Sequence, residues 1–156
     1  MSVVVTAART NRNGLRPKTD FYPTPPEATR ALLAVEPFAG PVWEPACGDG
    51  AIAKEFEAAG IDVVSTDLNP HGYGETGIDF LMEQALLAPE VVTNPPYSLA
   101  NNFVRHALAL GARRVAMLLR LAFLEGVQRS DIIDGGGLPV SMCSGSGSPW
   151  PRKASR

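Results

Sequence analysis

The chain has 156 residues, of which 14 are Lys or Arg and 16 are Asp or Glu, so its formal net charge is -2. This length suits one ordinary domain, and a hydrophobic share of 45% excludes disorder throughout. No apolar run reaches the roughly 18 residues that a membrane helix needs. Two cysteines, Cys47 and Cys143, build neither a disulfide framework nor a zinc site, so we expect a cytoplasmic protein that uses no membrane and no metal.

Residues 1–19 have no sustained hydrophobic period and predict a flexible arm. The chain carries four basic residues and no acid before Asp20, and three basic residues and no acid after Gly137. The seven other basic residues share the middle with all 16 acids, which gives this body a charge of -9. The distribution is compatible with a polyanionic partner that the arms contact, although termini that are basic by chance are the simpler interpretation.

The first regular element is a helix that begins near Thr24. Thr24 is suited to the N-cap, Pro25 and Pro26 to the helix start, and Glu27 to the position three residues after the cap. The helix is expected to run to about Val35, because Pro37 cannot continue it. A short buried strand at 41–44 then leads into a glycine-rich turn, and a helix at 51–59 stops at Gly60.

The second half alternates in the same way. We predict strands at 61–67, near 79, at 91–94 and at 115–119, and a helix from Ser98 to Gly111. Strands that alternate with helices predict an α/β fold, Rossmann-like and doubly wound, with a mostly parallel sheet. Beyond Asp134 the sequence is rich in Gly, Ser and Pro, and we expect residues 135–156 to be a disordered tail.

The segment EPACGDG at 44–50 follows a strand and opens a helix, as a nucleotide-binding loop does. Gly48 and Gly50 let a ligand approach the backbone, and the helix N-terminus offers N–H groups to a carboxylate. Glu44, at the strand end, is suited to a cationic amine. A plain strand-to-helix turn is the alternative interpretation of this segment.

Two acidic positions follow at spacings that suit a nucleoside. Asp67 ends the second strand of this series, where an acid can accept both ribose hydroxyls. Asp79 can accept a hydrogen bond from an adenine amino group, and Phe80 can pack on the ring. Taken alone, each of these residues is more simply structural, since Asp before Asn-Pro also forms turns.

The most specific motif is Asn94-Pro95-Pro96-Tyr97, directly after a strand. Two prolines fix the loop, so a side-chain amide and a backbone carbonyl are presented in a set geometry. An amine on a planar ring is a poor nucleophile because its lone pair is delocalised. The oxygens of Asn94 and Pro95 can accept its two hydrogens and favour a pyramidal nitrogen, while Tyr97 stacks on the ring. A rigid turn with a packed aromatic is the alternative.

Together these segments resemble the S-adenosylmethionine-dependent DNA adenine-N6 methyltransferases. EPACGDG resembles their cofactor loop, NPPY their catalytic motif, and DFYPTP at 20–25 the segment that closes over the methionine end of the cofactor. The resemblance covers about 20–129, and the compact spacing is similar to phage or prophage enzymes, which implies the cytoplasm of a bacterium or of a phage-infected host. It implies S-adenosylmethionine as cofactor and DNA as partner. The implied catalytic residues are Asn94, Pro95, Pro96 and Tyr97, and the implied cofactor-binding residues are Thr24, Glu44, Pro45, Ala46, Gly48, Gly50, Asp67, Leu68, Asp79 and Phe80.

The sequence departs from that family after the strand at 115–119. Such enzymes usually have seven strands, and the last antiparallel strands and a target-recognition domain are missing here, so we expect an incomplete methyltransferase domain over 20–134. The composition breaks near Gly137, and we hypothesise that the tail is a frameshift product. Two alternatives stay open: methyl transfer to a protein glutamine amide or an RNA guanine amine, and a catalytically dead remnant that only binds cofactor or DNA.

Overall fold

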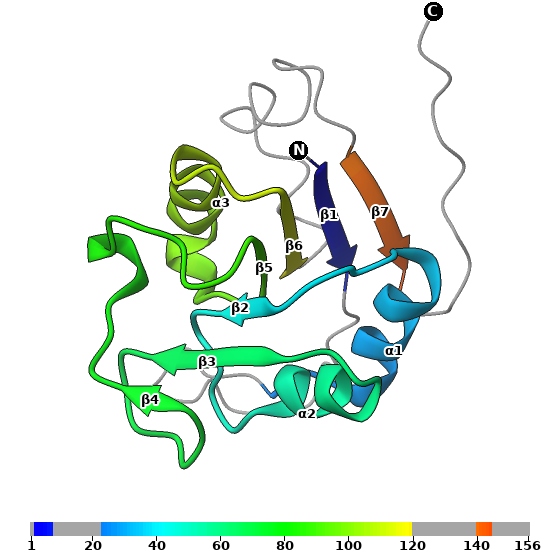
Figure 1. The fold of residues 1–156 in the computed structure, drawn as a ribbon, viewed down its shortest axis with the longest axis horizontal. Helices are drawn as coiled ribbons and strands as arrows, with labels where there is room; N and C mark the ends of the chain where they lie inside the picture. Colours follow the sequence, from blue (N-terminus) through cyan, green and yellow to red (C-terminus); the bar gives the residue numbers. More distant parts are fainter. Residues whose placement is uncertain (1, 8–22, 120–139, 145–156) are drawn as a thin grey trace, which may run out of the picture.

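The computed structural model describes residues 2–7, 23–119 and 140–144. Its described strands form one sheet in the order β4-β3-β2-β5-β6-β1-β7, and every pairing among them is parallel (Figure 1). The chain is therefore an α/β protein, as predicted. The strands are β1 Ser2–Ala7, β2 Val42–Glu44, β3 Val63–Asp67, β4 Glu75–Thr76, β5 Glu90–Thr93, β6 Arg114–Leu119 and β7 Val140–Ser144.

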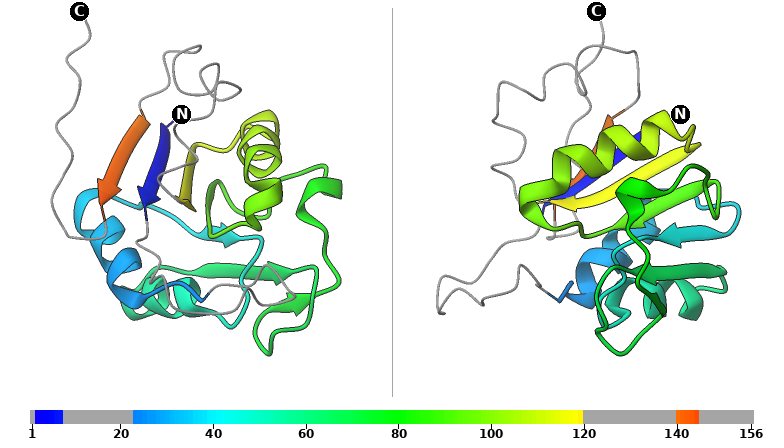
Figure 2. Two further views of the ribbon diagram at one scale, coloured as in Figure 1. Left: turned by 180° about the vertical axis from the view of Figure 1, so that it is seen from behind. Right: turned by 90° about the vertical axis from the view of Figure 1, so that its left-hand side faces the viewer.

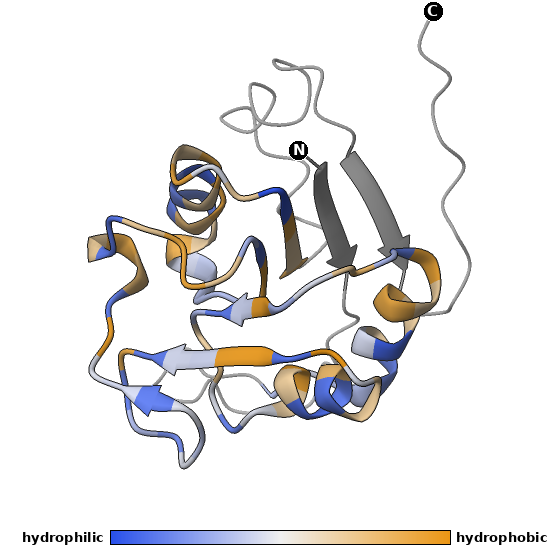
Figure 3. Ribbon diagram, viewed as in Figure 1, coloured by the Kyte–Doolittle hydropathy of each residue, from blue (hydrophilic) through white to orange (hydrophobic). Residues whose placement is uncertain are grey.

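Helices cover both faces of the sheet. α1 (Pro26–Val35) and α2 (Ala51–Ala58) pack together on one face, and α3 (Ala100–Ala109) lies on the other (Figure 2). Two short 3₁₀ helices, η1 (Phe80–Met82) and η2 (Tyr97–Leu99), precede β5 and α3 respectively. α1 and α2 each carry an apolar and a polar side, which is the pattern expected of helices that cover a sheet (Figure 3).

The core is divided by the sheet because successive side chains of a strand point to opposite faces. Val91 and Val115 belong to the cluster on the α3 side, whereas their neighbours Val92 and Ala116 belong to the cluster under α1 and α2. Both strands are apolar on both faces, as expected of a parallel sheet that is buried on both sides. None of the helices in the described part of the chain is long and apolar enough to cross a membrane.

The strand order reverses between β2 and β5. From β2 the chain continues outward to β3 and β4, whereas β5 lies on the opposite side of β2 and continues to β6. Ligands of open parallel sheets bind outside the carboxyl ends of the strands at such a reversal, because the connections leave a crevice there. Glu44 ends β2 and Thr93 ends β5, so the motifs at 44–50 and 94–97 both begin at this crevice.

Both ends of the described chain correct the sequence prediction. The arm predicted over 1–19 contains β1, which lies between β6 and β7, and the tail predicted to be disordered over 135–156 contains β7. The short run Val3 to Val5 favours a strand, but its partner Val115 to Met117 lies far along the chain, where a local period gives no sign of it. The predicted arm at 8–19 and most of the predicted tail lie outside the described residues.

Two local predictions are also wrong. No strand forms near 79, where the chain instead forms the 3₁₀ helix η1. The strand that follows β3 is the two-residue β4, a few residues earlier in the chain. Thr24 does not cap α1: the N-cap is Pro25, and no side chain caps it. The other elements predicted over 26–119 occur, with α2 ending before Gly60 and β6 ending at Leu119.

Candidate functional site

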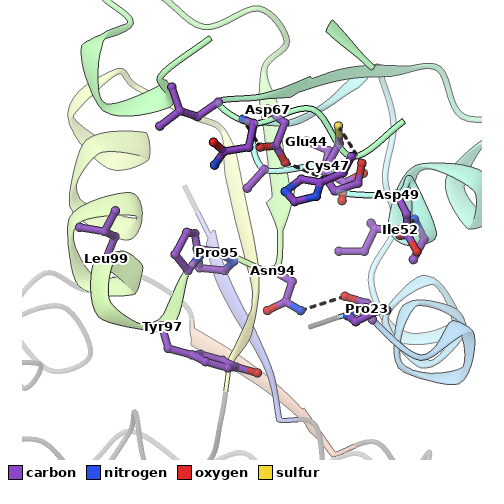
Figure 4. Close-up of a pocket in the computed structure, with 18 residues that line it drawn as sticks. Pro23, Glu44, Cys47, Asp49, Ile52, Asp67, Asn94, Pro95, Tyr97 and Leu99 are labelled. Atoms are coloured by element: carbon purple, nitrogen blue, oxygen red, sulfur yellow. Dashed lines mark hydrogen bonds between the residues drawn. The ribbon is translucent and has the colours of Figure 1, made fainter. Parts of the chain in front are cut away.

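A cavity of about 470 Å³ lies at the carboxyl ends of β2, β3 and β5 (Figure 4). This volume is in the range of small-molecule sites. The cavity is where the strand order reverses, as the fold predicts. Its lining residues are Pro23, Thr24, Glu44, Ala46, Cys47, Gly48, Asp49, Ala51, Ile52, Asp67, Leu68, Asn69, His71, Asn94, Pro95, Pro96, Tyr97 and Leu99.

The glycine-rich loop is fastened to β3 by a carboxylate. The backbone N–H of Gly48 donates to Oδ2 of Asp67 over 2.9 Å, and the N–H of Asn69 donates to Oδ1 of Asp67 over 2.8 Å. The N–H of Cys47 donates to the carbonyl oxygen of Thr66, which adds a backbone bond between the same two segments. Asp67 therefore shapes the loop and lines the cavity at the same time.

Glu44 places a buried carboxyl on the cavity wall. The residue is only 1% exposed, and its Oε2 has no hydrogen-bond partner among the described residues. Burial raises the pKa of Glu44 well above its usual range, and the nearby charges of Asp49 and Asp67 raise it further, while the N–H of Ala53 acts in the opposite direction. A cationic group in the cavity would offset that cost by pairing with the carboxylate.

The structure explains the glycine at position 50 by local backbone geometry and packing, and not by the close approach of a ligand. It does not line the cavity, its φ is +82°, and a Cβ built on it would lie 2.5 Å from Cγ of Tyr73. The Tyr73 hydroxyl donates to Oε1 of Glu57 in the last turn of α2 over 2.7 Å, which holds the ring alongside this helix. Gly50 is therefore required by the left-handed backbone and by the Tyr73 ring packed on it.

The loop after β5 meets the segment before α1 across the cavity. Nδ2 of Asn94 donates to Oγ1 of Thr24 over 3.1 Å, so a residue predicted to cap a helix instead contacts the predicted catalytic amide. In Figure 4 the amide nitrogen of Asn94 points toward Pro23 and its oxygen points away. Pro95, Pro96 and Tyr97 line the same wall.

Four of the residues singled out from the sequence do not line the cavity: Pro45, Gly50, Asp79 and Phe80. The Phe80 ring is 1% exposed, and its centroid lies 5.1 Å from that of Trp43 and 4.9 Å from that of Phe103. The Asp79 carboxylate accepts the N–H of Leu81 over 3.0 Å at the start of η1. The structure therefore gives both residues structural roles and does not bring them to the cavity.

Sequence reasoning missed several lining residues. Asn69 and His71 lie one and three residues after Leu68, so the only sequence signal for them is their place beside Asp67 and Leu68. Ile52 and Leu99 add apolar surface at the starts of α2 and α3, and Leu99 keeps 38% of its surface exposed. Isolated apolar residues at such positions are indistinguishable from core residues in sequence.

The charge of the lining is one-sided. Three carboxyl residues, Glu44, Asp49 and Asp67, face the cavity, and the lining residues in the described part of the chain include no Lys and no Arg. Such a wall repels phosphate and attracts cations. Comparison with known proteins adds no assignment: no protein-family model matches the chain, and no curated protein matches it.

Proposed function

We propose that the chain is an S-adenosylmethionine-dependent methyltransferase that acts on the N6 amine of adenine in DNA, and that its α/β sheet is a Rossmann-like methyltransferase fold. The observation that carries the proposal is the shared cavity. The acidic glycine-rich loop and the Asn94-Pro95-Pro96-Tyr97 loop, which lie far apart in the sequence, line one cavity at the reversal of strand order. A cofactor site and an amine-binding loop must adjoin for direct group transfer.

The charge of the cavity favours this cofactor over phosphate-bearing nucleotides. Dinucleotides and nucleoside triphosphates need cationic side chains or free N–H groups at their phosphates. Here the described lining residues include three carboxyl residues and neither Lys nor Arg, and the N–H of Ala51 at the start of α2 already donates to Oδ1 of Asp49. S-adenosylmethionine carries a sulfonium and an ammonium group and no phosphate.

The residues present fit that cofactor. Oε2 of Glu44, which has no hydrogen-bond partner among the described residues, is suited to a cationic amine, and Asp67 is suited to ribose hydroxyls at the end of β3. Ala46, Gly48, Leu68 and Ile52 also line this part of the cavity. The geometry does not support the adenine contacts that the resemblance implies for Asp79 and Phe80, and we therefore assign the cofactor ring to the apolar side chains of Leu68 and Ile52. When bound, the cofactor supplies a methyl group already activated by its sulfonium.

The loop after β5 would hold the reacting amine. The Asn94 side-chain oxygen and the Pro95 carbonyl accept its two hydrogens, which localises the nitrogen lone pair and makes the nitrogen a better nucleophile. Tyr97 packs on the ring of a base that has been turned out of the duplex. Because Pro95 and Pro96 restrict the backbone, these acceptors are oriented before the substrate arrives, and the protein contributes mainly positioning.

A labelled-methyl assay tests the proposal. The purified chain is incubated with methyl-labelled S-adenosylmethionine and, separately, with unmethylated genomic DNA, RNA and a protein extract, and the methylated product is identified by mass spectrometry. N6-methyladenine in DNA is expected. Label in a glutamine amide, in RNA guanine or on cytosine N4 would overturn the substrate assignment. If no substrate is methylated while calorimetry still shows cofactor binding, the enzyme assignment would be overturned. The result would support a catalytically dead remnant that only binds the cofactor.

A further inference from the structure

Thr24 lies just before α1, but its side chain does not cap the helix. Pro25 is the N-cap of α1, no side chain caps it, and the N–H of Ala28 donates to the carbonyl oxygen of Pro25 over 3.0 Å. Thr24 is only 7% exposed, so its hydroxyl cannot rely on bulk solvent for hydrogen bonding. The hydroxyl instead accepts a hydrogen bond from Nδ2 of Asn94 over 3.1 Å.

An asparagine amide has two chemically different ends, because its nitrogen only donates and its oxygen only accepts. The Thr24 hydroxyl accepts from the Asn94 nitrogen in this structure, so the amide oxygen is turned to the other side. Figure 4 shows this arrangement, with the Asn94 nitrogen directed toward the segment of Pro23 and Thr24 and the oxygen directed away from it. Only the oxygen can accept a hydrogen from an amine.

Thr24 is connected through α1 to the glycine-rich side of the cavity. Thr24 precedes α1, and α1 is joined to α2 by a two-pronged ion pair in which Nε of Arg30 lies 2.8 Å from Oε2 of Glu55 and Nη2 lies 3.1 Å from Oε1. α2 follows the glycine-rich loop that lines the same cavity. The hydroxyl that contacts Asn94 is therefore held by the elements that build the cofactor side of the cavity.

We propose that Thr24 is a positioning residue, whose hydroxyl holds the Asn94 amide with its oxygen toward the reacting amine. The inference rests on the proposed function for its consequence, and on the hydrogen bond of Thr24 with Asn94 for its geometry. It differs from the role that the resemblance implies for Thr24, which is contact with the cofactor. A positioning residue affects the transfer step, whereas a cofactor contact affects binding.

The experiment compares Thr24→Val, which keeps the shape and removes the hydroxyl, with Thr24→Ser, which keeps the hydroxyl. Thr24→Val is expected to lower kcat roughly 10- to 100-fold, as small misplacements of a reacting group do, and to leave the dissociation constant of the cofactor within about twofold. Thr24→Ser is expected to retain most of the activity. A loss of cofactor affinity with kcat unchanged would overturn the inference.

Repeating the Thr24 substitution in an Asn94→Asp variant distinguishes a loss of Asn94 amide orientation from a general disturbance of the site. In Asn94→Asp the two carboxylate oxygens are equivalent, so no partner is needed to choose between them. Removing the Thr24 hydroxyl should then cost less than about threefold in kcat, against the larger loss in the unmodified chain. Equal losses in the two backgrounds would overturn the inference. If Thr24→Val does not fold, Thr24→Ala replaces it in both backgrounds.

The last readout does not depend on methyl transfer. Nuclear magnetic resonance of the Asn94 side-chain amide, assigned by its loss in Asn94→Ala, should show the proton that the Thr24 hydroxyl accepts as hydrogen-bonded in the unmodified chain and in Thr24→Ser. That proton should shift and exchange faster in Thr24→Val. If the chain transfers no methyl group, the proposed function fails while this measurement still decides the geometry. An unchanged amide signal in Thr24→Val would overturn the positioning role.

Discussion

The backbone N–H of Gly48 donates to Oδ2 of Asp67 over 2.9 Å and so joins the carboxyl ends of β2 and β3. The second oxygen of Asp67 accepts the N–H of Asn69. One carboxylate thus holds two cavity-lining loops, and each of its oxygens still has a lone pair for a ligand. Under the proposed function, Asp67 therefore both shapes the cavity and contacts the cofactor.

Asp67→Ala should therefore lower both stability and cofactor affinity. The substitution leaves the N–H groups of Gly48 and Asn69 without their acceptor, which is expected to cost about 1–3 kcal/mol in free energy of unfolding. Affinity for S-adenosylmethionine, measured by calorimetry, should fall at least about tenfold. Asp62→Ala, at an exposed position just before β3, is the matched control and should change neither. An unchanged affinity in Asp67→Ala would remove Asp67 from the cofactor site.

Asn94→Ala should separate transfer from binding. It removes one of the two proposed acceptors of the amine, so the rate of methyl transfer should fall at least about 100-fold. The dissociation constant of the cofactor should stay nearly unchanged, because the proposed cofactor contacts come from other residues. Asn102→Ala, on the exposed side of α3, is the control and should keep full activity. A large loss of cofactor binding in Asn94→Ala would contradict the assigned role.

Gly50→Ala should destabilise the fold more than Gly60→Ala does. Both glycines have a positive φ, +82° and +79°, so each substitution carries a strain of about 1–2 kcal/mol. A Cβ at Gly60 meets nothing within 4 Å, whereas one at Gly50 lies 2.5 Å from Cγ of Tyr73. Urea unfolding should show an additional loss of about 1–3 kcal/mol at Gly50 alone.

If the Tyr73 ring obstructs a Cβ at position 50, removing the ring should remove the extra cost of Gly50→Ala over Gly60→Ala. In a Tyr73→Ala background the obstructing ring is gone, so Gly50→Ala should cost about as much as Gly60→Ala. The same difference between the two glycines in both backgrounds would refute the packing argument. Neither outcome depends on the proposed chemistry, because the measurement concerns the free chain.

Glu44 should make the stability of the free protein depend on pH. Its folded-state pKa is raised well above the unfolded value, so the folded state binds the proton more tightly. The free energy of unfolding should therefore fall as the pH rises from the unfolded pKa, about 4.3, through the folded one. Glu44→Gln removes the charge, and its stability advantage over the unmodified chain should be larger at about pH 8 than at about pH 5.

The matched control for that measurement is Glu75→Gln, at an exposed position in β4. Urea unfolding of the three proteins across this pH range should give parallel curves for the unmodified chain and Glu75→Gln, and a flatter curve for Glu44→Gln. Parallel curves for all three would show that Glu44 ionises in the folded protein as it does in the unfolded chain.

Local sequence signals predicted the helices and most of the strands that lie between 26 and 119, but neither β4 nor η1, and they predicted the residues that follow the ends of β2, β3 and β5. The motifs at 44–50 and 94–97 meet because parallel strands bring their carboxyl ends to one edge, which follows from the fold class alone. Phe80 could not be placed from sequence, since a core aromatic and a ring-binding aromatic are the same residue type. Thr24 suited a cap by its position, and only the three-dimensional structure shows that Asn94 competes for its hydroxyl.

The place of β1 in the sheet has a consequence for how the chain folds. β1 pairs with β6 and β7, and nearly the whole described chain separates it from both. Because β1 precedes β6 in the chain, its backbone groups lack these strand partners during synthesis until β6 has been made. Such non-local parallel pairing forms slowly, and an unpaired apolar strand can associate with other chains in the interval. The rate of synthesis and the availability of chaperones should therefore affect the yield of folded protein more than the stability of the finished sheet does.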